Sequence, residues 1–137
     1  MKFRHIITRW WPSVIVILVI LYATLYPDPA GVDKLPPIPY LDKLIHAIMF
    51  GGMAGALAFD HTRAVPGRRR PGHRVMLLCC LASIVAGGVI ELLQEAMGLG
   101  RGAEWLDFGA DALGVLVAYF AAPPAIAAVL RKKTVIP

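Results

Sequence analysis

The chain has 137 residues, of which 58% are hydrophobic and only 17% are charged, and its formal net charge is +5. Soluble domains use roughly 45–50% apolar residues. Here the charges stand in short blocks between long uncharged stretches, a pattern typical of membrane proteins. The basic residues fall between these stretches and form no stripe interleaved with aromatic residues, so we expect no nucleic-acid partner.

The first apolar stretch, residues 10–26, follows a basic amino-terminal flank and is predicted to be a transmembrane helix. Tryptophans at its start and tyrosines near its end are typical of the two membrane interfaces. No small-x-small cleavage site follows the stretch, which favours an uncleaved anchor. Prolines and a glycine crowd residues 27–39 and predict an extended loop there.

The second predicted helix covers residues 41–59 and contains Gly51 and Gly55. This small-xxx-small spacing lets another helix approach closely. A polar loop rich in arginine is predicted next, over residues 60–74. We expect His73 to be solvated within that loop.

The third helix is predicted over residues 75–97 and the fourth over 105–129. The adjacent Cys79 and Cys80 lie in the third helix and form no CxxC pair, so we interpret them as helix-packing residues. The proline pair at 123–124 is expected to kink or end the fourth helix.

The four predicted helices form a single all-α domain over residues 1–137, and basic residues predict its orientation. Lysines and arginines concentrate on the cytoplasmic side of membrane proteins. The amino-terminal flank, the 60–74 loop and the carboxy-terminal tail hold three, five and three of them, against two and one in the other loops. We therefore predict a four-helix transmembrane bundle with both ends in the cytoplasm.

Ionisable residues within the apolar helices share one depth near the predicted outer surface. With a rise of about 1.5 Å per residue, His46 lies about 8 Å into the second helix and Asp111 about 9 Å into the fourth, while Glu91 lies about 9 Å before the end of the third. A charge near the centre of a spanning helix costs roughly 2.5–3.5 kcal/mol, so such a group requires partners or a wet pocket.

On each of these three helices, two polar residues are three or four positions apart, so both occupy one face. The pairs are Asp42 with His46, Glu91 with Gln94, and Asp107 with Asp111. Lys43 and Arg101 add cations at the rim. We therefore expect the three faces to converge on one pocket, whose candidate ligand-binding residues are Asp42, Lys43, His46, Glu91, Gln94, Arg101, Asp107 and Asp111.

These residues resemble the pattern of the VanZ-like family of bacterial membrane proteins, over about residues 42–120. The pattern stands here as Asp42-Lys43-x-x-His46-x-x-x-Phe50, Glu91-x-x-Gln94, Arg101, and Asp107-x-x-Ala110-Asp111-x-x-Gly114. The family has asparagine where this chain has Asp111, and the added carboxylate would alter metal affinity or require a cationic neighbour. The resemblance implies a multi-pass protein of the bacterial inner membrane with a cell-envelope role, including teicoplanin-type resistance, without specifying a reaction.

Two interpretations of the polar residues involve no catalysis. In the first, ion pairs and helix caps only lock the helix ends together. In the second, the pocket binds an envelope lipid headgroup, a lipid-linked cell-wall precursor or an amphiphilic antibiotic, with Arg101, Lys43 and His46 on its anionic group. Because burying many charges is a poor way to gain stability, a binding site is the preferred function.

An enzymatic interpretation uses the same pocket. His46 would act as a general base or metal ligand on an envelope lipid, with Glu91 and Asp107 or Asp111 completing the site. No serine or cysteine lies near the predicted outer site to act as a nucleophile, which speaks against covalent catalysis. The sequence specifies neither a cofactor nor a metal, and it favours binding over catalysis.

Overall fold

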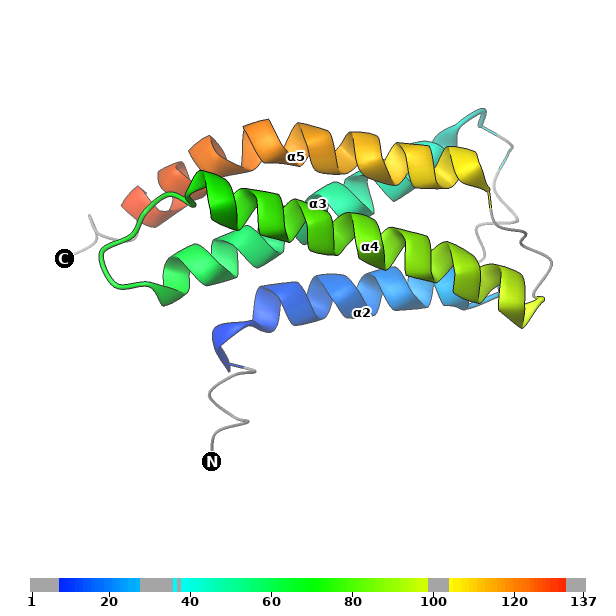
Figure 1. Ribbon diagram of the computed structural model, residues 1–137, viewed down its shortest axis with the longest axis horizontal. Coiled ribbons are helices and arrows are strands. Elements are labelled where there is room, and N and C mark those ends of the chain that lie inside the picture. Colours follow the sequence, from blue (N-terminus) through cyan, green and yellow to red (C-terminus); the bar gives the residue numbers. More distant parts are fainter. Residues whose placement is uncertain (1–7, 28–35, 37, 99–103, 133–137) are drawn as a thin grey trace.

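The computed structural model describes residues 8–27, 36, 38–98 and 104–132, and this part of the chain is helical (Figure 1). Its helices are α2 (Trp11–Leu25), α3 (Leu41–Ala64), α4 (His73–Met97) and α5 (Trp105–Lys132). No strand occurs among the described residues. The predicted all-α architecture of four helices is confirmed.

Local signals account for two helix ends, the start of α2 and the end of α4. Pro12 stands in the first turn of α2, where a missing backbone N–H costs nothing. Gly98 follows α4 with φ of 60°, the left-handed conformation that commonly ends a helix. The proline pair at 123–124 does not end α5, which continues to Lys132.

The bounds differ from the sequence prediction mainly at the arginine-rich end of the bundle. Helix α3 continues past residue 59 to Ala64, and α4 begins at His73 instead of residue 75. The prediction of a polar loop over residues 60–74 is therefore wrong at both of its ends. His73 is the first residue of α4, and its ring is hydrogen-bonded to the Tyr119 hydroxyl of α5.

The extended part of α3 contains Asp60, a carboxylate that we expected in a loop and that is fully buried. Its Oδ2 accepts hydrogen bonds from the backbone N–H of Ser13 at 2.9 Å and from the Ser13 hydroxyl at 2.7 Å. Its Oδ1 accepts a hydrogen bond from the Arg63 guanidinium at 3.0 Å. Because a buried charge is tolerated when it is paired and hydrogen-bonded, Asp60 can join α2 to α3 here.

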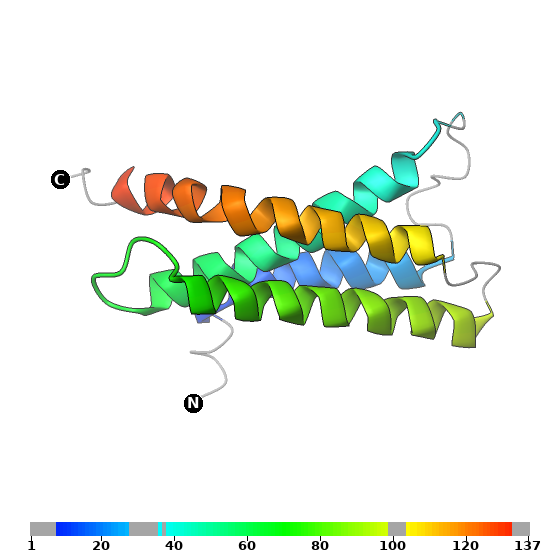
Figure 2. The same ribbon diagram turned by 45° about the horizontal axis from the view of Figure 1, so that its top comes forward.

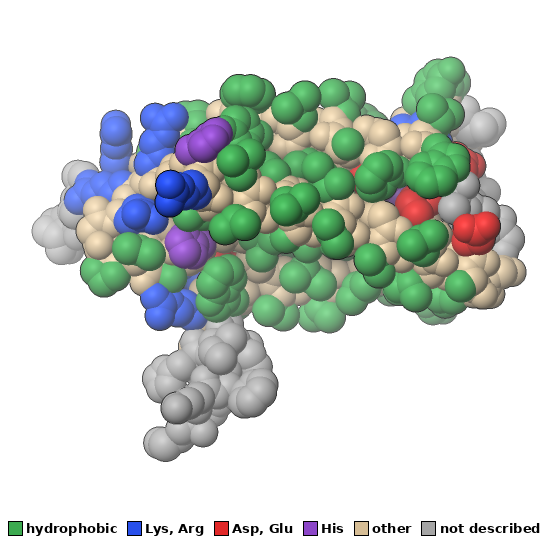
Figure 3. Space-filling model, viewed as in Figure 1, with side chains coloured by type: hydrophobic (Ala, Val, Ile, Leu, Met, Phe, Trp, Pro, Cys, Tyr) green, Lys and Arg blue, Asp and Glu red, His purple; other side chains and the backbone are tan. Residues whose placement is uncertain are grey.

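Helices α3, α4 and α5 are long and apolar enough to cross a membrane. Helix α2 is also apolar but has 15 residues, fewer than the roughly 20 that a spanning helix needs. Large apolar side chains such as Leu78 and Leu92 are more than 60% exposed, and hydrophobic groups cover much of the face drawn in Figure 3. Such extensive apolar exposure indicates a surface that meets lipid.

Helices α3 and α5 cross in close contact, with α3 passing behind α5 in Figure 2. A Cβ atom at Gly51 would lie 2.6 Å from the carbonyl oxygen of Gly114, and one at Gly114 would overlap the carbonyl of Ala47. At Gly55 a Cβ atom would meet the Ala122 Cβ at an ordinary 3.8 Å. Of the two predicted small residues, Gly51 therefore lies at the close approach, and Gly114 is its partner.

Candidate functional site

Charged side chains largely separate along the bundle, with most Lys and Arg at one end of the face in Figure 3 and most Asp and Glu at the other. The acidic end brings together the start of α3, the end of α4 and the start of α5. Its ionisable residues contact one another, and we name them the polar cluster: Asp42, Lys43, His46, Glu91, Glu104, Asp107 and Asp111.

Lys43 is the centre of the more exposed half of the polar cluster. Its ammonium nitrogen, Nζ, lies 2.6 Å from Asp42 Oδ2, 2.8 Å from Glu104 Oε2 and 2.7 Å from Asp107 Oδ1. An ammonium group has three N–H donors, and these three carboxylates use all of them. Lys43 therefore offsets part of the negative charge of its carboxylate neighbours and has no donor left for an anionic ligand.

Glu104 was not among the residues predicted for the site. It stands immediately before α5 and so lacks the helical spacing that identified the other polar residues. Its backbone N–H donates to Glu91 Oε2 at 3.1 Å, while its side chain reaches Lys43. These two contacts bring Glu104 into the polar cluster, and no spacing in the sequence predicts them.

His46, on α3, is the centre of the buried half of the polar cluster. Its Nδ1 lies 3.0 Å from Asp111 Oδ1, and its Nε2 lies 4.0 Å from Asp107 Oδ2. One potential ligand atom from each of His46, Glu91 and Asp107 lies within 4.8 Å of the other two. Three helices thus place a nitrogen and two carboxylates around one point.

Two carboxylate oxygens of this buried half have no hydrogen-bond partner among the described residues: Glu91 Oε1 and Asp111 Oδ2. Glu91 is 6% exposed and Asp111 is 1% exposed. An unpartnered buried polar group costs about 1–3 kcal/mol, and more when it is charged. The polar cluster is therefore incomplete as a purely internal network, and a cation or a hydrogen-bond donor would complete it.

Small and aromatic residues give Asp111 and His46 their positions. A Cβ atom at Gly87 of α4 would lie 2.7 Å from Asp111 Oδ2, so a glycine is needed for the carboxylate to fit against α4. The His46 ring stacks on Phe50 one turn further along α3, with 6.2 Å between ring centroids. These contacts hold the imidazole and the carboxylate in one orientation.

Two of the predicted site residues are not seen in the polar cluster. Gln94 lies on α4 one turn beyond Glu91, but its Nε2 donates to the Thr24 carbonyl at 2.8 Å and joins α4 to α2. The three-residue spacing from Glu91 predicted that both side chains share one face of the helix. It could not predict that Gln94 is hydrogen-bonded to α2. Arg101 lies outside the described residues.

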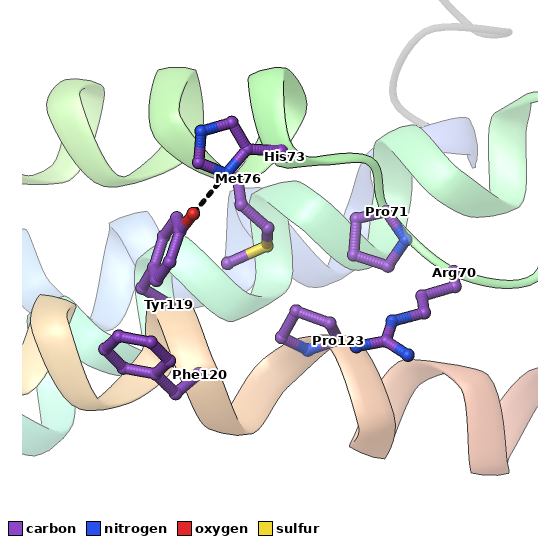
Figure 4. A pocket seen from close by; sticks show the side chains of 7 residues that line it. All are labelled: Arg70, Pro71, His73, Met76, Tyr119, Phe120 and Pro123. Atoms are coloured by element: carbon purple, nitrogen blue, oxygen red, sulfur yellow. Dashed lines mark hydrogen bonds between the residues drawn. The ribbon is translucent and has the colours of Figure 1, made fainter.

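A separate cavity lies at the basic end of the bundle, between the start of α4 and the second half of α5 (Figure 4). Its volume is about 270 Å³. Its lining residues are Arg70, Pro71, His73, Met76, Tyr119, Phe120 and Pro123. The pattern of the sequence did not indicate this cavity, because His73 and Tyr119 are 46 residues apart.

Comparison of the chain with family models, with curated proteins and with solved structures finds no match in any of the three. The fold and the polar cluster define an all-helical protein with three membrane-compatible helices and a buried histidine–carboxylate group at one end. Membership of the VanZ-like family therefore stays a prediction from the residues quoted above.

Proposed function

We propose that the chain is a four-pass protein of the bacterial inner membrane, with both ends in the cytoplasm and the polar cluster on the outer side. The separation of basic and acidic ends supports this orientation, because lysine and arginine concentrate in cytoplasmic loops. Helix α2 would be the fourth crossing. A short apolar helix can span a membrane where the bilayer thins locally or flanking side chains extend to the interface.

At the polar cluster the protein binds the headgroup of an envelope lipid or of a lipid-linked cell-wall precursor. The observation that carries this proposal is the pair of buried, unpartnered oxygens, Glu91 Oε1 and Asp111 Oδ2. Membrane proteins tolerate costly intramembrane ionisable groups mainly at functional sites. In the proposed orientation the polar cluster lies near the outer interface of the membrane, where lipid headgroups lie, and a cell-envelope role of this kind is also what the VanZ-like resemblance implies.

The charges of the polar cluster favour a headgroup with hydroxyl or amine donors over a bare phosphate. Its carboxylates outnumber Lys43, the only lysine or arginine among its residues, and would repel an anion. The ammonium of Lys43 is already surrounded by carboxylates, so it is not available to an anionic group of the ligand, contrary to the expectation from the sequence. Of the other two predicted anion contacts, His46 lies beside Asp107 and Asp111, and Arg101 is outside the described residues.

Replacing Glu91 by glutamine separates a ligand site from a structural lock. Removal of a buried charge relieves desolvation, so a site residue should leave the melting temperature equal or higher while lipid retention is lost. A lock residue should instead lower the melting temperature. We expect the first result, measured by thermal unfolding in detergent together with native mass spectrometry of co-purifying lipid.

Glu95→Gln is the matched control, because Glu95 is exposed on the same helix. It should change neither the melting temperature nor the retained lipid. A Glu91→Gln protein that is destabilised yet keeps its lipid would leave only the structural interpretation.

A further inference from the structure

We propose that His46, Glu91 and Asp107 bind a divalent transition-metal ion, with Asp111 orienting the His46 ring through a hydrogen bond to Nδ1. The inference concerns the same polar cluster and rests on the proposed headgroup function for the role of the ion, although its geometry stands on the side chains alone.

The distances within the trio suit one shared ion. Protein nitrogen and oxygen ligands lie about 2.0–2.2 Å from a metal such as zinc, which places neighbouring ligand atoms about 3–4 Å apart. His46 Nε2 and Asp107 Oδ2 are 4.0 Å apart. A potential ligand atom of Glu91 lies within 4.8 Å of a ligand atom of each of these two residues. Side-chain movements of a few tenths of an ångström to about one ångström would therefore bring all three ligand atoms to metal-binding distance.

Asp111 supplies the outer support that a ligating histidine ordinarily has. A metal-bound imidazole donates its other N–H to a carboxylate, which fixes the tautomer and makes the ligand more basic. Asp111 Oδ1 lies 3.0 Å from His46 Nδ1. With the Nδ1 proton on that bond, the His46 Nε2 lone pair faces Asp107 and is free to bind an ion.

The unpartnered oxygens are an independent sign that a cation belongs here. Glu91 is more than nine-tenths buried, and its Oε2 accepts the Glu104 N–H while Oε1 has no partner among the described residues. The two oxygens of Asp107 have different neighbours: Oδ1 contacts Lys43, and Oδ2 faces His46. In the neighbouring group of Asp42, Glu104 and Asp107, the ammonium of Lys43 already occupies the position of a cation. The trio of His46, Glu91 and Asp107 is therefore where a metal ion would bind.

The ligand types indicate the kind of ion and its role. One imidazole and two carboxylates suit Mn²⁺, Fe²⁺ or Zn²⁺ better than Ca²⁺ or Mg²⁺, which prefer oxygen ligands alone. Three protein ligands leave positions open, as at sites where metals bind substrates. An ion there would accept a phosphate oxygen of a headgroup and so remove the repulsion that the bare carboxylates impose.

Manganese is the probe for the test, because its electron paramagnetic resonance signal reports free ion and bound nitrogen. The full-length protein in detergent, treated with chelator and then dialysed, is titrated with Mn²⁺. We expect one bound ion per chain with ¹⁴N coupling from His46. His46→Gln should abolish the coupling, and His46→Gln and Asp107→Asn should weaken binding at least about tenfold, with Asp111→Asn weakening it about 10- to 100-fold.

Glu95→Gln is the control for an unrelated surface carboxylate and should bind Mn²⁺ as the wild type does. Circular dichroism identifies any variant that does not fold, and the remaining variants then decide. No bound Mn²⁺, binding without ¹⁴N coupling, or an Asp42→Asn variant weakened as much as Asp107→Asn would overturn the proposal, because each places the ion elsewhere or nowhere.

Lipid retention, measured on the same samples, separates this inference from the proposed function. Wild-type protein that keeps its lipid but binds no Mn²⁺ overturns the metal site alone. Protein that binds Mn²⁺ with ¹⁴N coupling but keeps no lipid supports the metal site and contradicts the headgroup function.

Discussion

Gly114→Ala is expected to destabilise the protein by about 3 kcal/mol or more, the upper end for overpacking a tight interior. The added Cβ atom would overlap the backbone carbonyl of Ala47, which α3 holds in place. A flexible side chain could move aside, but a helix backbone cannot, so α3 and α5 must separate. Thermal or denaturant unfolding in detergent measures the loss.

Gly109→Ala is the matched control on the same helix. Nothing lies within 4 Å of a Cβ atom at Gly109, so this change should be neutral or stabilise by up to about 1 kcal/mol through helix propensity. Equal stability of the two variants would contradict the close packing of α3 on α5, and with it the mutual placement of His46 and Asp111.

Lys43→Met is expected to destabilise the acidic end by roughly 1.5–3 kcal/mol, the range for losing a hydrogen bond to a charged group. Most of that loss should come from Asp107, whose side chain is 15% exposed. Asp42 and Glu104 are more than half exposed, and exposed ion pairs contribute little. The change in melting temperature in detergent gives the magnitude.

Calcium should restore part of the stability lost in Lys43→Met. Without the ammonium, oxygens of Asp42, Glu104 and Asp107 lie within 4.8 Å of one another and present an all-oxygen group, which is what Ca²⁺ prefers. The wild type should respond less to the same Ca²⁺ concentration. Equal melting temperatures for Lys43→Met and wild type would show that Lys43 does not hold the carboxylates together.

Regular patterns along the chain predicted both the helices and the proximity of His46, Glu91 and Asp107. Long apolar stretches fix where helices lie, and a period of 3.6 residues fixes which side chains share a face at a given depth. Lys43 and Asp111 could be placed near that meeting by the same logic. The sequence therefore predicted which side chains lie close together, but not which hydrogen bonds and ion pairs they form.

Other features depend on contacts between distant parts of the chain. Asp60 looked like a loop residue because it is charged and begins an arginine-rich stretch, but Ser13, 47 residues away, gives it buried partners. Gln94 donates a hydrogen bond to the carbonyl of Thr24, 70 residues away. Glu104 joins the polar cluster from outside any helix. Such pairings have no local signature, so pattern and spacing alone could not predict them.

Accessibility of single cysteines tests most directly whether the polar cluster faces outward. In a background with Cys79 and Cys80 replaced by alanine, Ile38→Cys would mark the acidic end and Pro66→Cys the basic end, both at exposed positions. On intact spheroplasts, a membrane-impermeant maleimide should label Ile38→Cys, and Pro66→Cys only after the membrane is opened. Labelling of Pro66→Cys from outside, with Ile38→Cys protected, would contradict the proposed orientation, because the polar cluster would then face the cytoplasm.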